Sequence, residues 1–213
     1  GVGRKRRGED RKMAQIEKIT QQTDNRFVNL YHVQGKNRVG KPLNYYVASR
    51  AKTIEQMKLK TKVNRPDGVI IYSLYGEKRD KVILVKQYRV AIDDYIYEFP
   101  AGLVEENEDY HQAAIREMHE ETGLDFQPIQ TEECFEKPYF TTIGMTDESC
   151  ASVYGYATGT ISRQYMEESE EIEVVLADRE EVARILREEN VAIMCAYQLM
   201  HFLKNDDPFY FLK

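Results

Sequence analysis

The chain has 213 residues and a formal net charge of −6, which argues against a protein whose main task is to bind nucleic acid. Aromatic residues make up 11% of it, with 15 Tyr and no Trp, so ring stacking must depend on Tyr and Phe. The three cysteines are widely spaced without a C-x-x-C pair, which disfavours a zinc site or a disulfide framework.

Two hydrophobic features that would indicate a membrane or an export route are missing from the sequence. No run of about 18 apolar residues could span a bilayer. The first residues contain no apolar segment like that of a secretory signal. We therefore expect a cytoplasmic protein with no membrane partner and no nucleic-acid partner.

Residues 1–12 carry six Lys or Arg without hydrophobic periodicity, and this composition predicts a disordered basic extension. Such a segment could be a nucleic-acid-binding arm, or it could be an extension added upstream of Met13. We favour the upstream extension. Residues 26–62 then contain three strand-like runs, FVNLYHVQG, LNYYVASRA and IEQMKLK, with turn signals between the first two. We predict a small antiparallel N-terminal β unit over residues 13–65.

Residues 66–213 read as a larger domain of strands and helices. The expected strands are DGVIIYSLY, DKVILVKQYRV, YIYEFPAG, CFEKPYF, SCASVYGYATG and EEIEVVLAD. Helices are expected at residues 113–122, 179–189 and 192–204. Strands, one acidic helix, more strands and closing helices predict an α/β sandwich with a mixed sheet.

The helix predicted at residues 113–122 is unusually acidic. It consists mostly of good helix formers, and Gly123 follows where a left-handed C-terminal cap is needed. Glu117, Glu120 and Glu121 are spaced by three and four residues, so they share one face and repel each other. A cation is expected there, and Mg²⁺ prefers such oxygen ligands. Another side of the helix should bury its apolar residues against a sheet: Ala114, Ile115, Met118 and Thr122.

The segment from Gly102 to Leu124 places Gly102, Glu108 and the run Arg116-Glu117-Met118-His119-Glu120-Glu121-Thr122-Gly123 at the spacing of the signature box of Nudix hydrolases. The chain resembles that family over this segment. The resemblance implies a Nudix-type α/β/α sandwich and a Mg²⁺-dependent hydrolase, with Mn²⁺ as a possible substitute. It implies metal ligation by Glu117 and Glu121, with Glu120 assisting and Arg116 positioning these carboxylates. Glu108 would have a structural role or a metal contact.

Gln87-Tyr88-Arg89 and Glu98-Phe99-Pro100-Ala101-Gly102 narrow the resemblance to ADP-ribose pyrophosphatase-like enzymes. By this resemblance the backbone carbonyl of Ala101 would reach a metal, and Leu103 would contact substrate. Arg89 would bind a phosphate or the ribose, for which its planar, permanently charged fork is suited. The alternative for Arg89 is an ordinary surface arginine paired with a carboxylate.

Two segments after the box supply further candidates through the same resemblance. Residues 142–148 partly match a substrate-binding loop, which makes Gly144 and Glu148 candidates; Ile143 stands where the family usually has Pro, and a plain hairpin is the alternative. Residues 166–171 are acidic, and a carboxylate there would deprotonate the attacking water. We choose Glu168, with Glu170 second; a solvated acidic turn is the alternative.

The activity implied by the resemblance is hydrolysis of ADP-ribose, or a similar nucleoside diphosphate sugar, to AMP and ribose 5-phosphate. A homodimer is implied too, with Arg65 and the pair Tyr45-Tyr46 as candidate contacts to adenine or phosphate; tyrosines in a strand also suit packing. Other functions stay open: cleavage of another sugar nucleotide such as GDP-mannose, a non-catalytic ligand sensor, or action on RNA. The intact box and the net charge disfavour the last two.

Overall fold

The computed structural model describes residues 13–166 and 171–213, so the extension predicted for residues 1–12 lies outside the described residues. The chain forms two compact units. One runs to Asn64 and includes Phe140–Glu148, and the other comprises Arg65–Tyr139 and Ser149–Lys213.

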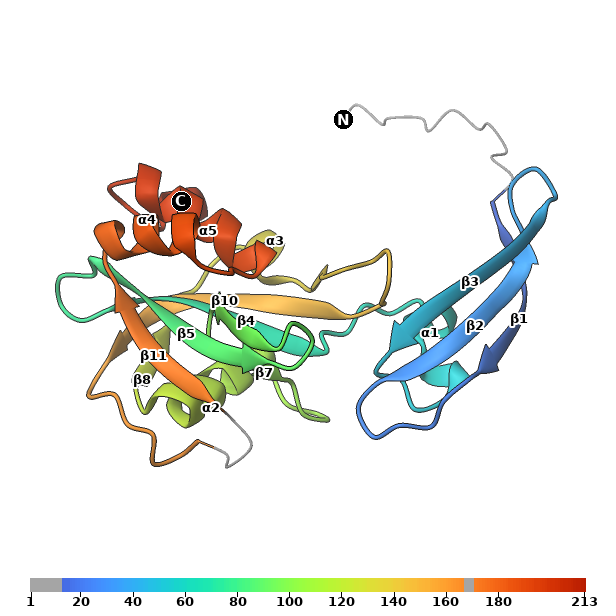
Figure 1. The fold of residues 1–213 in the computed structure, drawn as a ribbon, viewed down its shortest axis with the longest axis horizontal. Coiled ribbons are helices and arrows are strands. Elements are labelled where there is room, and N and C mark those ends of the chain that lie inside the picture. Colours follow the sequence, from blue (N-terminus) through green and yellow to red (C-terminus); the bar gives the residue numbers. More distant parts are fainter. Residues whose placement is uncertain (1–12, 167–170) are drawn as a thin grey trace, which may run out of the picture. The chain divides into compact units, whose positions relative to one another are not determined.

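The N-terminal unit is built on a three-stranded antiparallel sheet in the order β1-β2-β3 (Figure 1). Strands β2 (Asn29–Lys36) and β3 (Pro42–Ser49) confirm two predicted strands, and β1 (Gln15–Gln21) is additional. The third predicted strand, IEQMKLK, is wrong. It forms the 3-10 helix η1 (Ile54–Gln56) and the short helix α1 (Lys58–Thr61), because Thr53 and Gln56 form a capping box that favours a helical turn.

The second unit contains the predicted mixed sheet, in the order β11-β5-β4-β10-β8, with β6 beside β5, β7 beside β4 and β9 beside β10. Strand β10 runs parallel to β4 and antiparallel to β8. The strands are β4 (Gly68–Tyr75), β5 (Lys81–Arg89), β6 (Asp94–Glu98), β7 (Ala101–Leu103), β8 (Asp125–Pro128), β10 (Ser149–Thr158) and β11 (Ile172–Ala177). Strand β9 (Tyr139–Phe140) lies at the boundary, with Tyr139 in this unit and Phe140 in the other.

Helices cover both faces of this sheet (Figure 1). Helix α2 (Tyr110–Thr122) packs on one face, while α4 (Arg179–Glu188) and α5 (Ile193–Lys204) cover the other. The run CFEKPYF, predicted as one strand, is a strand only at its last two residues, which form β9, and its first three residues belong to helix α3 (Glu133–Glu136). Pro138 cannot donate to a strand ladder, which limits the strand to the residues after it. The chain closes with η2 (Tyr210–Leu212). Among the described residues, no helix is long and apolar enough to cross a membrane.

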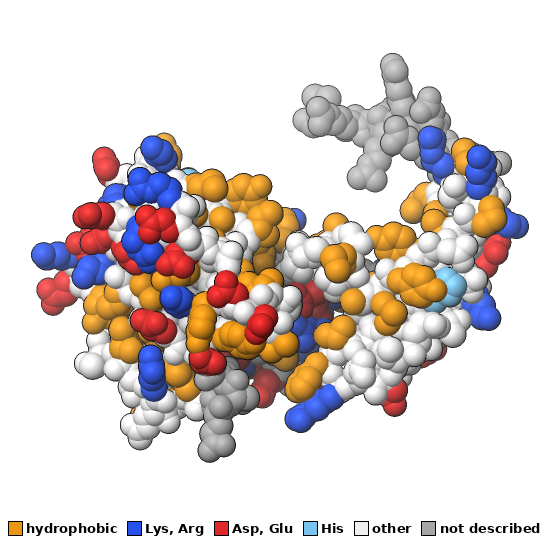
Figure 2. Space-filling model, in the orientation of Figure 1, with side chains coloured by type: hydrophobic (Ala, Val, Ile, Leu, Met, Phe, Trp, Pro, Cys, Tyr) orange, Lys and Arg blue, Asp and Glu red, His pale blue; other side chains and the backbone are white. Residues whose placement is uncertain are grey.

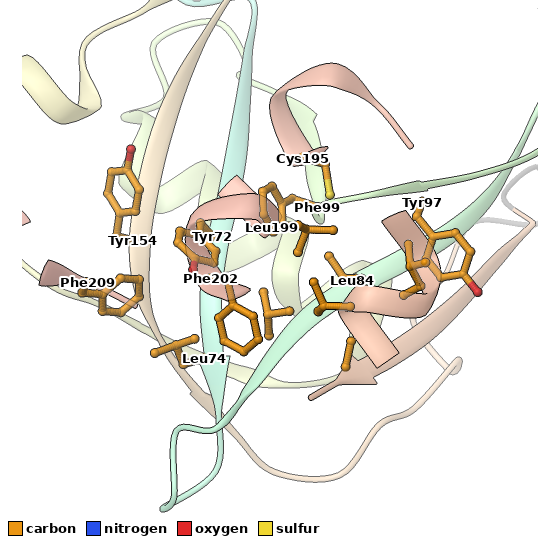
Figure 3. Close-up of a cluster of buried hydrophobic side chains, with 14 residues drawn as sticks. Tyr72, Leu74, Leu84, Tyr97, Phe99, Tyr154, Cys195, Leu199, Phe202 and Phe209 are labelled. Atoms are coloured by element: carbon orange, nitrogen blue, oxygen red, sulfur yellow. The ribbon is translucent and has the colours of Figure 1, made fainter. Parts of the chain in front are cut away.

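Strand β4 supplies side chains to two cores. Val69 and Ile71 pack in the cluster beneath α2, whereas Tyr72 and Leu74 belong to the cluster under α4 and α5, with Phe202 at its centre (Figure 3). A strand buried on both faces reads as a continuous apolar run, which explains the sequence VIIYSLY. On the outer surface of these helices, side chains of both charges are mixed over α4, whereas apolar side chains gather over α5 (Figure 2).

Helix α2 confirms the acidic helix predicted from sequence. The side chain of Asp109 accepts a hydrogen bond from the backbone N–H of His111 at its start, and Gly123 ends it at φ 75°. Met118 is fully buried against the sheet as expected. The predicted burial of Ile115 is wrong, because its side chain is 43% exposed and Ala113 occupies the sheet-facing position instead.

Candidate active site

The short strand β7 brings backbone groups of the box against side chains of α2. Gly102 pairs with Val69 of β4, whose side chain lies in the cluster beneath α2. The backbone N–H of Ala101 donates to Oε2 of Glu121 at 3.1 Å, and Glu121 is only 3% exposed. A buried carboxylate is costly unless it is hydrogen-bonded, so this contact fixes Glu121 beside β7.

Gly102 leaves the space that the carboxylate of Glu117 occupies. A Cβ atom on Gly102 would stand 1.9 Å from Cδ of Glu117 and 2.0 and 2.3 Å from its two carboxylate oxygens. No larger residue fits at this position without moving Glu117. The glycine of the box is therefore a steric requirement of the glutamate fifteen residues later in the chain.

Arg116 organises the acidic groups around it. Its Nε and Nη2 each donate to a carboxylate oxygen of Glu108 at 3.0 Å. Its Nη1 donates to Glu117 at 2.8 Å and to Glu120 at 3.0 Å, and Nη2 also donates to the carbonyl of Leu103 at 3.1 Å. One guanidinium thus links the loop before α2, the strand β7 and two glutamates of the helix.

These contacts shift ionisation equilibria in the expected directions. Hydrogen bonds from Arg116 lower the pKa of Glu108 below its ordinary value of 4.5. The pKa of Arg116 is raised, chiefly by its hydrogen bonds to Glu108 and then by those to Glu117. Both groups are therefore held in their charged forms at neutral pH.

The acidic residues suit a hard divalent cation that is only partly coordinated by protein. No group of three or more His, Cys, Asp or Glu side chains within residues 13–166 and 171–213 is arranged to hold a metal on its own. Mg²⁺ commonly takes one or two carboxylates and fills its octahedron with waters and substrate phosphates. Glu117, with a side chain 12% exposed, and the buried Glu121 lie beside the backbone of Ala101 and Gly102, so these residues fit that ion. Glu120 is more open, at 45%.

Two arginines predicted to contact substrate lie in the same unit as the box. Arg89 donates from Nε to Glu98 at 2.7 Å, and its side chain is 50% exposed. This carboxylate pairing is the alternative to a substrate contact that was expected for Arg89 from the sequence. Arg65 donates to the carbonyl of Glu105 at 3.1 Å, just before the box helix. The substrate contacts of both arginines stay predictions.

Of the remaining candidates, two lie in the N-terminal unit, one lies on β7, and two fall outside the described residues. Gly144 and Glu148 belong to the N-terminal unit, where Tyr45 donates to the carbonyl of Gly144 and Arg50 donates to Glu148 at 2.8 and 2.7 Å. Leu103 is 44% exposed on β7. The two candidates for the general base, Glu168 and Glu170, lie outside the described residues.

The bidentate pair between Arg116 and Glu108 was not predicted from the sequence. Eight residues separate them, and Glu108 precedes the helix, so helical spacing gave no signal. The backbone N–H of Glu105 also donates to Glu108 at 2.9 Å, which turns the chain back toward Arg116. Glu108 is therefore a structural partner of the box arginine.

Comparison with known proteins agrees with this geometry. A family model described as NUDIX domain matches residues 64–196. Putative nudix hydrolase 2 of Caenorhabditis elegans is 36% identical over 121 residues, which cover 53% of this chain and 52% of that protein; the match thus spans about half of each. ADP-ribose pyrophosphatase of Saccharomyces cerevisiae is 28% identical over 142 residues, covering 64% and 58%.

A solved structure described as "Crystal structure of ADP compounds hydrolase" superposes with a TM-score of 0.61. It covers 92% of this chain and 95% of that one at 15% identity, so the likeness supports the fold. The family match extends over more than half of the chain and includes every element of the site described above. The chain belongs to the Nudix family.

Proposed function

We propose that the protein hydrolyses the diphosphate of ADP-ribose, or of a similar nucleoside diphosphate sugar, with Mg²⁺ or Mn²⁺ as cofactor. The observation that carries this proposal is the packing of Glu117 and Glu121 against the backbone of Ala101 and Gly102, with Arg116 holding Glu117. The substrate class is supported by the relative named ADP-ribose pyrophosphatase.

In the proposed reaction, the oxygen of a water molecule attacks one phosphorus and the bond from that phosphorus to the bridging oxygen breaks. The products are AMP and ribose 5-phosphate. When bound, Mg²⁺ would offset the diphosphate charge and make the water more acidic. Glu117, Glu121 and the carbonyl of Ala101 would hold it, with Glu120 assisting. Arg116 would keep Glu117 and Glu120 in place through its hydrogen bonds.

Other side chains of this chain would select the substrate and accept the proton. Glu168, or Glu170 as the second choice, would take the proton from water. Arg89 would exchange Glu98 for a phosphate oxygen, which is reasonable for a side chain that is half exposed. Arg65, Leu103, Gly144 and Glu148 would complete the contacts to the substrate.

The proposal includes a homodimer. The N-terminal sheet leaves apolar side chains partly exposed, among them Leu30 at 38% and Tyr46 at 55%, which suits an interface between copies. Light scattering coupled to size exclusion would give the mass: about twice the 25.0 kDa of one chain supports this part, and one chain mass opposes it. Cytoplasmic location stays a sequence prediction.

A substrate panel tests the activity. ADP-ribose, ADP-glucose, GDP-mannose, a diadenosine polyphosphate and a deoxynucleoside triphosphate would be assayed with Mg²⁺ and with chelator. Glu121→Gln keeps the shape of the buried side chain and removes its charge, so we expect a loss of kcat of at least about 100-fold. Glu180→Gln is the matched control, because Glu180 is an exposed glutamate on α4, a helix that covers the other face of the sheet.

The expected result is Mg²⁺-dependent turnover of ADP-ribose, with AMP and ribose 5-phosphate identified by ³¹P NMR. Turnover of no diphosphate compound would overturn the proposal. A preference for GDP-mannose would support the proposed reaction type and show that the proposed substrate is wrong. Comparing Glu168→Gln with Glu170→Gln tests the base, and we expect the larger loss of kcat at Glu168.

A further inference from the structure

A cavity lies between helix α5 and the sheet, on the face of the sheet opposite to the box helix α2. Its volume is about 590 Å³, which is within the range of small-molecule sites. Strand β4 contributes Ile70 and Tyr72 to its lining, and α5 contributes Tyr197 and Gln198. All of its lining residues belong to the second unit, so this unit forms the cavity by itself.

Aromatic rings form most of the wall of this cavity. The ring of Tyr72 packs beside that of Phe99, with centroids 5.1 Å apart, and beside that of Tyr154 at 6.2 Å (Figure 3). These three residues are buried. Tyr139 and Tyr197 also line the cavity but are 54% and 66% exposed, so their rings are accessible to a ligand. A planar ring that enters the cavity can stack on such accessible aromatic faces.

The polar groups of the cavity suit one nucleobase edge better than a sugar. The hydroxyl of Tyr154 already donates to the carbonyl of Phe135 at 3.1 Å, and that of Tyr139 donates to the carbonyl of Cys134 at 2.8 Å. The side-chain amide of Gln198 makes no hydrogen bond with another described residue. An amide offers a donor and an acceptor side by side, which matches N7 and N6 of adenine. The several hydroxyls of a sugar would be left against apolar walls, at a cost in free energy.

The cavity extends to the strand that carries the candidate metal ligands. Ile70, which lines the cavity, pairs with Ala101 of β7. Opposite residues of an antiparallel pair project to the same face, so Ala101 is on the cavity face of the sheet, whereas Gly102 faces Glu117. Phe99 lines the cavity only two residues before Ala101, or about 7 Å along an extended chain. The cavity and the box glutamates therefore lie on the two faces of the same short strand.

We propose that this cavity binds the nucleobase of the substrate, with adenine preferred. This inference rests on the proposed function and adds the group by which the second unit recognises its substrate. The base would stack on Tyr139 and Tyr197 and pair with the amide of Gln198, while the diphosphate, attached through the ribose, extends to β7. Such recognition lowers KM more than it changes kcat, because the base takes no part in the bond that breaks.

Equilibrium binding of adenosine, measured in chelator by saturation-transfer NMR, tests the site without the reaction. Tyr197→Ala removes a largely exposed ring and should leave the fold intact. Tyr210→Ala is the matched control, since Tyr210 is 67% exposed and is not among the described residues that line the cavity. Loss of a stacked ring predicts a Kd for adenosine at least about 5-fold higher in Tyr197→Ala, with no change in Tyr210→Ala.

Two further measurements sharpen the test. With ADP-ribose as substrate, Tyr197→Ala should raise KM at least about 5-fold and change kcat less than about twofold. Gln198→Leu should reduce the preference for adenosine over guanosine by at least about 5-fold.

Equal affinity of the wild type and Tyr197→Ala for adenosine would overturn the site. An equal loss in Tyr210→Ala, or a wild type that binds no adenosine, would overturn it as well. If adenosine binds as expected but no diphosphate is cleaved, the proposed function fails and the nucleobase site stands.

Discussion

Gly102→Ala should abolish the proposed hydrolysis while leaving the protein folded. The new Cβ would stand 1.9 Å from Cδ of Glu117, and an ordinary carbon–carbon contact is about 3.5 Å, so the carboxylate must retreat by about 1.5 Å. A displacement of that size at the proposed metal ligand Glu117 predicts a fall in kcat/KM of about 100-fold, equal to roughly 2.7 kcal/mol of barrier.

The stability cost should be small, because the atoms that move are the far end of a flexible side chain. The main interaction at risk is the hydrogen bond from Arg116 to Glu117 at 2.8 Å, worth roughly 1 kcal/mol. The free energy of unfolding would be measured by urea titration, and kcat/KM for ADP-ribose would be measured over a range of Mg²⁺ concentrations.

A double-mutant cycle with Glu117→Ala tests whether the loss of activity in Gly102→Ala comes from the displaced carboxylate of Glu117. If Gly102→Ala acts by displacing the carboxylate, it should reduce activity no further once Glu117 is alanine. Wild-type activity in Gly102→Ala would refute the steric reasoning. A large loss of stability that accounts for the inactivity would refute it as well.

Three further outcomes follow from the structure. The pKa of Glu108 is lowered, so its contribution to stability is present above pH 4.5 and is lost as the pH falls through the lower folded value; the difference in Tm between wild type and Glu108→Gln, measured in chelator, should be large at pH 7 and shrink below pH 4.5. Gly123→Ala combines a φ of 75° with a clash at Ser162, so Tm should fall by at least about 3 °C. Phe202→Ala empties a fully buried position and should cost about 3–5 kcal/mol in a urea titration.

The sheet of the second unit, Arg65–Tyr139 and Ser149–Lys213, was largely predictable because its central strands are long and apolar. Strands β4, β5 and β10 are buried on both faces, and their runs of Val, Ile, Leu and Tyr allow few other structures. Strand β1 escaped prediction because its register shifts between Ile16 and Lys18, which breaks the alternation that marks a strand. Strand β8 places one apolar side chain, Phe126, in the core and so has no period to detect.

The placement of the box glutamates on one helix was predictable for a different reason, because helical spacing is regular. Contacts that join segments distant in the sequence were not predictable. The loop Phe140–Glu148 belongs to the N-terminal unit, where the N–H of Ala48 donates to the carbonyl of Met145 at 2.9 Å. Nothing in the local sequence around Gly144 or Glu148 encodes that long-range pairing, so their unit could not be inferred from their motif.

Arg116 stabilises the acidic site and still leaves room for the cation proposed there. Glu108, Glu117 and Glu120 all accept hydrogen bonds from this one guanidinium, which cannot offset three carboxylates, so the site retains negative charge that attracts a divalent ion. Arg116 keeps its bonds to Glu108 and to the carbonyl of Leu103 even if a cation draws Glu117 away. Because those bonds attach α2 to β7 without Glu117, the helix and strand can stay in register while the carboxylate of Glu117 exchanges its partner.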